Sequence, residues 1–596
     1  MPRLPDIPVD SALARLFAKP RVEEEATWFS LPGGATLYKS GEPADQLFLV
    51  RAGRLGAIRR EADHEPQFLG VIKPGEPAGE MALMAGTAHS ADVVALRDSE
   101  IFALPREVFF DAAEQDPGVM TELARLMILR TRQAATRAGG GVPSVFGFVT
   151  VGKPVALRPL VDRIGRAIGR LGYTVTVIGA EATHAPTEWF SEVERTHDFV
   201  LYLAEANELS WRALVSRQVD RLFRVGLGDM APPHVTPNPG LAAPLEAQDL
   251  VDLILIQPTD RKMPQGSEAW AKAINPSRVF HVRRDGEADI ERLARVITGQ
   301  SVGLVLSGGG ARAYAHIGAI RALRERGVPI DFVGGASMGA VVAAGVAMGW
   351  DDEELDHRIR KAFVDSSPLD DIAIPLLAMT QGLKVSERLA EHFGEAAISD
   401  LWLPFFCVSS NLTTGTYHLH RRGRLTRALR ATIALPGILP PATDDNEVLV
   451  DGAVLKNFPA DIMHAIQLGP VVGVDVTRGR SITATDVARP ESVWRWIFSG
   501  QWRKGPPIVS LLMRAATVST GRDLVAAREA TDVLVTPDVA GVEIRDWEAY
   551  EPAVENGYAA MSAALDALDR PVTDLRRRAS LEELAAAPRT LGAAVR

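Results

Sequence analysis

The residues of this chain best suited to chemistry are a run of three glycines and a serine that stands between two further glycines. They read Ser307-Gly-Gly-Gly-Ala-Arg312 and Gly335-Ala-Ser-Met-Gly339. Glycines let backbone N–H groups approach an anion closely. A Gly-x-Ser-x-Gly turn holds a serine hydroxyl exposed on a strained turn between a strand and a helix. The two motifs together predict a nucleophile, Ser337, beside a loop that binds an oxyanion.

The elements that must position these residues can be read from the flanking sequence. Each motif follows an apolar run typical of a buried strand, Val302–Leu306 and Ile330–Val333, and a helix-like segment, Tyr314–Arg326, lies between the runs. A strand–helix–strand crossover is right-handed and makes its two strands parallel. If the strands are neighbours, the amides of Gly308–Gly310 lie beside Ser337 at one edge of one sheet.

A serine nucleophile also needs a general base. In the Ser-His-Asp arrangement of an α/β-hydrolase the histidine follows the acid in the chain, but here only His464 follows Asp451, inside a helix-like stretch. Asp451 itself ends an apolar run and is followed by Gly452 and Ala453. We expect Asp451 to reach the sheet edge that holds Ser337. A carboxylate bonded directly to the serine acts as base if its surroundings raise its proton affinity.

Composition narrows the class of protein. With 596 residues the chain should hold about three to five domains of roughly 100–200 residues each. A net charge of −10 argues against a nucleic-acid partner. One cysteine, Cys407, excludes an internal disulfide framework, and the N-terminus lacks the apolar core of a signal peptide, so we expect a cytoplasmic protein. The uncharged run Phe332–Trp350 has nearly the length of a membrane span, but it contains the serine turn and is better explained as a buried strand and helix.

Residues 1–137 predict a small antiparallel barrel or jelly roll. Short apolar runs broken by glycine follow one another between Phe29 and Leu104. This region resembles the cyclic-nucleotide-binding domain in Gly79-Glu-Met-Ala-Leu83 and the Ser90-Ala91 step that follows.

The resemblance implies that Glu80 meets the ribose hydroxyl of a bound nucleotide. The arginine that meets the cyclic phosphate in that family is replaced by His89. A neutral imidazole is a weaker phosphate partner than a fixed bidentate cation. We therefore expect a regulatory module whose nucleotide site is weakened or lost, and binding of a cyclic nucleotide remains open.

Residues 144–300 alternate strand-like and helix-like segments, which predicts a Rossmann-like α/β layer. The segment from Gly147 to Lys153 has the spacing of a phosphate loop, but Pro154 stands where Ser or Thr is required and the intervening residues are strand-like. We expect a spacer or docking domain here and no ATP site.

The order Gly308-Gly-Gly-Ala-Arg-Ala313, Gly335-Ala-Ser-Met-Gly339 and Asp451-Gly-Ala453 resembles the patatin-like phospholipase family, as does Asn457-Phe-Pro-Ala-Asp461. Ala313 and Ala453 stand where glycine is commoner. The family uses a Ser–Asp dyad without histidine, and no metal or cofactor is implied. Carried over, the resemblance implies Ser337 as nucleophile, Asp451 as base, oxyanion donors at Gly308, Gly309 and Gly310, and Arg312 steadying that loop or a lipid phosphate.

The wider layout is similar to the neuropathy target esterase type of lysophospholipase. We divide the chain into a cyclic-nucleotide-binding-like domain (1–137), a Rossmann-like linker domain (144–300), an α/β patatin-like domain with a mainly parallel sheet (301–501) and a C-terminal extension (502–596). The resemblance implies cleavage of an acyl ester in a lysophospholipid or phospholipid.

Two segments suit a lipid surface, and we expect peripheral contact with the inner face of the membrane. Val493–Lys504 mixes three tryptophans with three cations, and His420–Arg430 is a basic run. A solvated charged loop or helix face explains either segment equally well.

Two other functions compete with hydrolysis. Gly308-x-Gly310-x-x-Ala313 fits the dinucleotide fingerprint, but the acid that a dinucleotide site needs, Asp331, begins its strand instead of ending it. The alternative that we retain is a cyclic-nucleotide-responsive sensor with a weak or silent hydrolase domain. It predicts intact nucleotide contacts and a broken serine site, and the sequence has the reverse.

Overall fold

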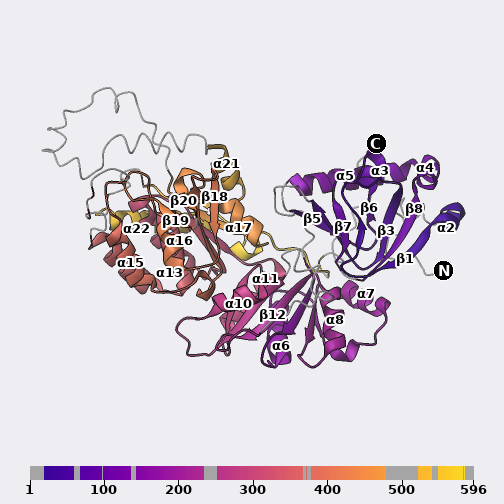
Figure 1. The fold of residues 1–596 in the computed structure, drawn as a ribbon, viewed down its shortest axis with the longest axis horizontal. Helices are drawn as coiled ribbons and strands as arrows, with labels where there is room; N and C mark the ends of the chain where they lie inside the picture. Colours follow the sequence, from indigo (N-terminus) through magenta and orange to yellow (C-terminus); the bar gives the residue numbers. More distant parts are fainter. Residues whose placement is uncertain are drawn as a thin grey trace, which may run out of the picture.

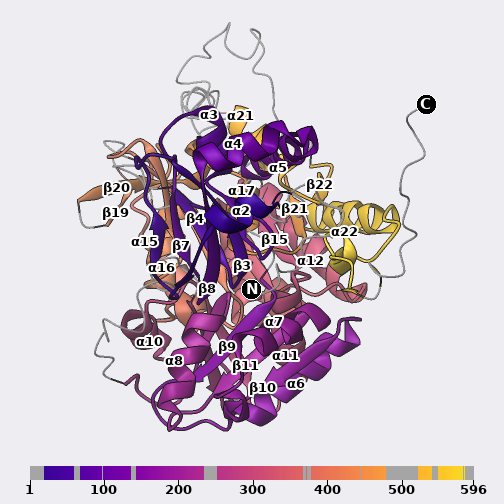
Figure 2. The ribbon, with the colours of Figure 1, turned by 90° about the vertical axis from the view of Figure 1, so that its right-hand side faces the viewer.

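The computed structural model describes residues 16, 19–59, 67–96, 98–135, 143–233, 251–366, 371, 373, 378–444, 446–477, 521–539, 542, 546, 548–581 and 583. The chain folds into three units, coloured indigo to violet, magenta, and pink to yellow in Figure 1 and seen from the side in Figure 2. The predicted fold class, a jelly roll followed by two α/β units, is confirmed.

The N-terminal unit consists of two four-stranded antiparallel sheets in the orders β1-β8-β3-β6 and β2-β7-β4-β5. Apolar side chains of both sheets, among them Val50, Leu55 and Ile101, form the core between them. Helices cover one end of the two sheets (Figure 1). The elements are β1 (Thr27–Leu31), β2 (Thr36–Tyr38), β3 (Gln46–Ala52), β4 (Leu55–Arg59), β5 (Gln67–Ile72), β6 (Pro77–Ala78), β7 (Asp92–Ala95), β8 (Ser99–Pro105), α2 (Pro20–Glu25), α3 (Glu80–Ala85), α4 (Arg106–Glu114) and α5 (Pro117–Ala135).

The middle unit is a six-stranded, fully parallel sheet in the order β10-β11-β9-β12-β13-β14. Its first three strands are arranged differently from the 3-2-1 order of a dinucleotide-binding sheet. Gly147 lies inside β9, so the phosphate-loop spacing falls on a strand. The elements are β9 (Val145–Thr150), β10 (Val175–Ile178), β11 (Phe199–Ala204), β12 (Arg221–Leu227), β13 (Val251–Gln257), β14 (Val279–Arg283), α6 (Leu157–Arg170), α7 (Thr187–Thr196), α8 (Leu209–Gln218), α10 (Ser267–Ile274) and α11 (Glu287–Thr298).

The third unit is built on an eight-stranded mixed sheet in the order β19-β20-β17-β16-β15-β21-β22, with β18 also paired to β17. The two strands expected to be neighbours, β15 and β16, pair in parallel with Leu306 opposite Gly335. The parallel strands are β15 (Gly303–Leu306), β16 (Phe332–Ala336), β17 (Phe405–Asn411), β21 (Val471–Val474) and β22 (Val533–Val535), and the antiparallel ones are β18 (Thr416–His420), β19 (Ala442–Asp444) and β20 (Glu447–Val450).

Helices cover this sheet, and the serine helix α13 is the most buried of those described. Its residues Ser337 to Ala347 are all buried, which accounts for the uncharged run Phe332–Trp350 as β16 followed by α13. Within the described residues no helix combines the length and apolarity needed to cross a bilayer. The helices are α12 (Ala315–Glu325), α13 (Ser337–Met348), α14 (Asp352–Ile359), α15 (Leu383–Phe393), α16 (Leu425–Thr432), α17 (Ala460–Ile466), α21 (Gly521–Glu529) and α22 (Tyr550–Asp566).

The segment assigned to a C-terminal extension contributes to this unit. Strand β22 pairs in parallel with β21, and α22 packs against α12 where both helices carry a glycine. A Cβ added at Gly318 would lie 1.9 Å from the Val554 carbonyl oxygen, and one at Gly557 would lie 1.8 Å from the Ala315 oxygen. Backbones approach this closely only where side chains are absent.

The middle unit packs directly on the third unit. Phe280 and Phe332 meet edge to face with ring centroids 6.0 Å apart, inside a core cluster shared by both sheets. Two arginines of the predicted basic run, Arg421 and Arg422, donate to the carbonyls of Ser277 and Pro276. These two cations therefore contribute to the contact between units.

Candidate active site

Ser337 occupies a strained turn between β16 and α13. Its φ is 52°, in the left-handed region that costs a non-glycine residue roughly 1–2 kcal/mol. The flanking glycines have no room for a side chain, because a Cβ at Gly335 would lie 2.5 Å from the Leu306 oxygen and one at Gly339 would lie 2.4 Å from the Ser307 oxygen. The turn is therefore pressed against the end of β15.

Thr432, the last residue of α16, stabilises this strained backbone. The Ser337 amide donates to Thr432 Oγ1 at 2.9 Å, and the same hydroxyl donates to the Val408 carbonyl at 2.5 Å. Thr432 is fully buried. Its hydroxyl thus links the serine turn to strand β17, and the Ser337 N–H is occupied.

Asp451 accepts a hydrogen bond from the serine hydroxyl. Ser337 Oγ lies 2.6 Å from Asp451 Oδ2, and the Ala453 amide donates to Asp451 Oδ1 at 2.8 Å. Asp451 is 2% exposed. Burial raises the pKa of Asp451 to about 6, although the bonds from Ser337 and Ala453 act to lower it. A carboxylate with this pKa is a stronger base than a solvated aspartate and is still ionised at neutral pH.

The route by which Asp451 reaches the serine differs from the expected one. We expected the strand before Asp451 to end at the same edge of the sheet as the strand before Ser337. Instead, β20 runs antiparallel to β17, with Val450 opposite Ser410. The acid therefore approaches from the opposite direction, and its backbone is held on both sides. The Asp451 amide donates to the Ala434 carbonyl at 2.9 Å, and Ser410 Oγ donates to the Asp451 carbonyl at 2.9 Å.

Three histidines of this unit, His316, His420 and His464, have partners other than the serine. His316 is fully buried and bonds through Nε2 to the Ser307 carbonyl at 2.8 Å, and burial lowers its pKa to about 4. His420 bonds to Ser409 Oγ at 2.8 Å, while His464 contacts Arg576. The hydrogen-bond partner of the serine hydroxyl is therefore a carboxylate and not a histidine.

The glycine loop lies against the serine. A Cβ on Gly308 would come within 2.9 Å of Ser337 Cβ. The Gly308 amide, predicted as an oxyanion donor, already donates to the Asn457 carbonyl at 3.2 Å. Among the described residues, the amides of Gly309 and Gly310 donate to no backbone carbonyl in a turn or loop.

Arg312 follows the loop in a short 3₁₀ turn, Gly310–Tyr314. Its Nε donates to the Val542 carbonyl at 2.8 Å. Of the two roles that the sequence allowed, this bond favours steadying of the loop.

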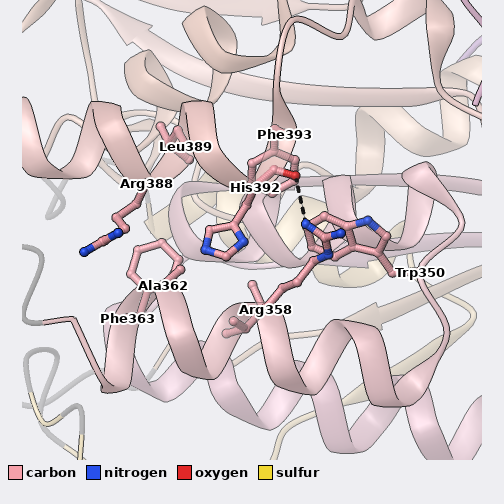
Figure 3. Close-up of a pocket in the computed structure, with 9 residues that line it drawn as sticks. Trp350, Arg358, Ala362, Phe363, Arg388, Leu389, His392 and Phe393 are labelled. Atoms are coloured by element: carbon pink, nitrogen blue, oxygen red, sulfur yellow. Dashed lines mark hydrogen bonds between the residues drawn. The ribbon is translucent and has the colours of Figure 1, made fainter.

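A separate cleft lies between α14 and α15, beyond the far end of α13 from Ser337. Figure 3 shows Arg358 over the Trp350 ring, 4.9 Å from its centroid, and donating to the His392 carbonyl at 3.5 Å. Its other lining residues are Ile359, Ala362, Phe363, Arg388, Leu389 and Phe393. The cleft contains neither member of the dyad and none of the glycine loop.

Within the part of the chain that is described, no three His, Cys, Asp or Glu side chains are grouped so that they could hold a metal ion. The Trp-rich segment 493–504 lies outside the described residues.

In the N-terminal unit, the position of the missing arginine is filled by an aromatic stack. His89 is buried, and its ring stacks on Tyr38 with centroids 3.6 Å apart and an interplanar angle of 13°. The ring also covers Gly79, whose added Cβ would lie 3.1 Å from His89 Cε1. Burial lowers the pKa of His89, with Glu42 and Asp45 opposing the shift. Glu80 is buried at the start of α3. The cassette thus presents a neutral imidazole where a cation would meet phosphate.

Thr432, Ser410 and Asn457 support the site and were not identified as such from sequence. Only Asn457 stood in a quoted motif. The two hydroxyl residues lie in strand-like and helix-like stretches where serine and threonine are ordinary, so no local signal distinguished them.

Comparison with known proteins agrees with this architecture. Residues 304–464 match the model of the patatin-like phospholipase family and residues 28–116 that of the cyclic nucleotide-binding domain. Neuropathy target esterase sws of Drosophila melanogaster is 27% identical over 83% of this chain and 39% of its own length. Human patatin-like phospholipase domain-containing protein 6 is 27% identical over 89% of this chain and 44% of its own.

An uncharacterized NTE family protein of Mycobacterium tuberculosis matches this chain along most of its length. The two are 33% identical over 556 residues, which cover 90% of this chain and 91% of the relative. The third unit is accordingly a hydrolase domain of the phospholipase and esterase type. A cyclic-nucleotide-binding fold precedes this domain, and the identity extends along most of the chain. The protein therefore belongs to the NTE family.

Proposed function

We propose that the protein hydrolyses acyl ester bonds of lysophospholipids or phospholipids through a Ser337–Asp451 dyad. The observation that carries the proposal is the 2.6 Å bond from Ser337 Oγ to a buried carboxylate. Burial of Asp451 supports its role as base, and the relatives named as phospholipases and esterases support a lipid substrate.

In the proposed reaction Asp451 Oδ2 accepts the proton of Ser337 Oγ while Oγ attacks the ester carbonyl carbon. The resulting oxyanion accepts hydrogen bonds from the Gly309 and Gly310 amides, since the Gly308 amide is already engaged. The carbon–oxygen bond to the leaving alcohol then breaks, and Asp451 returns the proton to that oxygen.

The second half of the cycle releases the fatty acid. A water molecule gives its proton to Asp451 and attacks the acyl carbon of the acyl-serine. The bond from that carbon to Oγ breaks, and the proton on Asp451 returns to Ser337. The same carboxylate serves as base and then as acid in each half.

The test is Ser337→Ala, assayed on lysophospholipids, phospholipids and a short acyl ester. We expect kcat to fall by on the order of 10⁵–10⁶-fold, with an unchanged melting temperature. A fluorophosphonate probe should label the wild type at Ser337 and leave the variant unlabelled. Ser386→Ala, an exposed serine on α15 that bonds only locally, is the matched control. Hydrolysis retained by the Ser337 variant would contradict the proposal.

We infer further that the lipid surface is met peripherally. Vesicle flotation should recover the protein with lipid vesicles, and extraction by high salt should release it. Resistance to such extraction would contradict peripheral contact.

A further inference from the structure

Asn457 surrounds the first glycine of the oxyanion loop with hydrogen bonds. It lies in the turn between Asp451 and α17, and its carbonyl accepts from the Gly308 amide at 3.2 Å. Its side-chain Nδ2 donates to the Gly308 carbonyl at 3.1 Å and to Thr477 Oγ1 at 2.7 Å. Both polar groups of Gly308 are therefore bound by one residue.

The orientation of the Asn457 amide follows from its partners. The Gly308 carbonyl oxygen can only accept, so the NH₂ end of the carboxamide must face it. Asn457 Oδ1 is consequently left buried without a hydrogen-bond partner. An unpaired buried acceptor is unfavourable, so the contacts of the NH₂ end must offset the cost of this orientation.

Fixing the Gly308 carbonyl also fixes the next N–H. In a planar trans peptide the C=O and the following N–H point in opposite directions. Because the Gly308 carbonyl points to Asn457, the Gly309 N–H points away from Asn457. This amide is one of the two that the proposed reaction uses as oxyanion donors.

The far side of the loop is braced by the end of β21. The Val476 amide donates to Ser307 Oγ at 2.9 Å, and a Cβ at Gly309 would lie 2.5 Å from Val476 Cγ2. Thr477, the second partner of Asn457 Nδ2, belongs to the same segment. Rotation of the Gly308–Gly309 peptide would therefore break the bond to Asn457 and press on Val476.

We propose that Asn457 is a positioning residue for the oxyanion hole, whose carboxamide holds the Gly308–Gly309 peptide so that the Gly309 N–H faces the substrate. This role rests on hydrolysis at Ser337. Asn457 touches neither the ester nor Asp451 and acts through the glycine loop.

Asn457→Asp tests the role, because it replaces the NH₂ donor by a carboxylate oxygen with nearly the same shape. That oxygen repels the Gly308 carbonyl and favours rotation of the peptide. We expect kcat to fall about 10–100-fold, somewhat less than deletion of a whole oxyanion donor, with little change in KM. Asn556→Asp is the matched control, since Asn556 Nδ2 also donates to a backbone carbonyl, that of Asp538 at 2.9 Å, at an exposed position of helix α22.

A thionoester substrate separates this role from general destabilisation. Sulfur accepts hydrogen bonds weakly, so a thionoester gains little from the oxyanion hole. If Asn457 positions that hole, the ester-to-thionoester rate ratio falls in Asn457→Asp by the same factor as kcat. An unchanged ratio, with both substrates slowed equally, would overturn the proposal.

Asn457→Ala provides the second variant in case the aspartate does not fold. It keeps the backbone bond to Gly308 and removes the side-chain bond, so we expect a smaller fall in both kcat and the ratio. Wild-type rates in both folded variants would overturn the proposal while leaving the dyad intact. Activity retained by Ser337→Ala would instead overturn the hydrolysis on which it rests.

Discussion

The candidate serine site and the cyclic-nucleotide-type cassette are the two regions of this chain where the sequence predicts anion binding, and they differ in what occupies the place of the anion. At the serine, the Gly309 and Gly310 amides bond to no loop carbonyl among the described residues, and Asp451 Oδ2 lies 2.6 Å from Ser337 Oγ. In the cassette, the His89 ring lies 3.6 Å from Tyr38 over Gly79. In the first region a polar side chain bonds to the Ser337 hydroxyl. In the second region an aromatic ring packs where the phosphate would be expected. The same fold can therefore be kept while the groups at its expected ligand site change.

Among the changes that compare the two regions, Asp451→Asn should lower activity most. Asparagine keeps the shape and accepts from Ser337, but it cannot take the proton, so we expect kcat to fall about 10⁴-fold. Steady-state hydrolysis with protein of verified melting temperature is the measurement. Asp569 bonds to the adjacent Arg570. Asp569→Asn should therefore behave as wild type. Activity within tenfold of wild type would remove Asp451 as base.

The pH dependence should report the buried carboxyl. Because the pKa of Asp451 is raised to about 6, kcat/KM should rise as pH increases through about 6 and level off above it. The midpoint should vanish from the residual activity of Asp451→Asn. A profile flat from pH 5 to 8 would contradict the raised pKa.

As pH rises through about 6, the contribution of Asp451 to the stability of the folded protein should fall while kcat/KM rises. A carboxyl whose pKa is higher in the folded than in the unfolded protein favours folding while it is protonated and opposes folding once ionised. A shift of about two units corresponds to roughly 3 kcal/mol. Asp451→Asn should therefore raise the free energy of unfolding at pH 8 by about that amount, and the gain should shrink toward pH 4. A destabilised variant at pH 8 would contradict burial of an ionised carboxylate.

The smallest expected effect concerns the cassette. We expect calorimetry on the whole protein to show no saturable binding of cAMP or cGMP up to about 1 mM, a free energy weaker than roughly −4 kcal/mol. His89→Arg supplies a charged partner for phosphate, and a bond to a charged group contributes about 1.5–3 kcal/mol, so weak binding should appear. Micromolar binding by the wild type would show that the Tyr38–His89 stack opens, and the two regions would then be alike.

Much of the catalytic site was predictable because its residues are required by local geometry. Gly335 and Gly339 stand where a Cβ would meet backbone oxygens, and Ser337 adopts a φ that few residues tolerate, so the motif is visible in a short window of sequence. Six alternating strands of the middle unit were likewise readable from apolar runs. The direction of β20 was not, because an antiparallel strand and a parallel one have the same local pattern when both are short and apolar.

Sequence alone predicted the candidate nucleophile, the loop beside it, the candidate acid and the histidine in place of a nucleotide-binding arginine, since each is a residue type at a required spacing. Tertiary structure decided how these residues are held. The Ser337 amide meets Thr432 across 95 positions and Asn457 meets Gly308 across 149, contacts that no local pattern encodes. The raised pKa of Asp451 depends in the same way on burial by distant segments, because desolvation is a property of everything packed around a group.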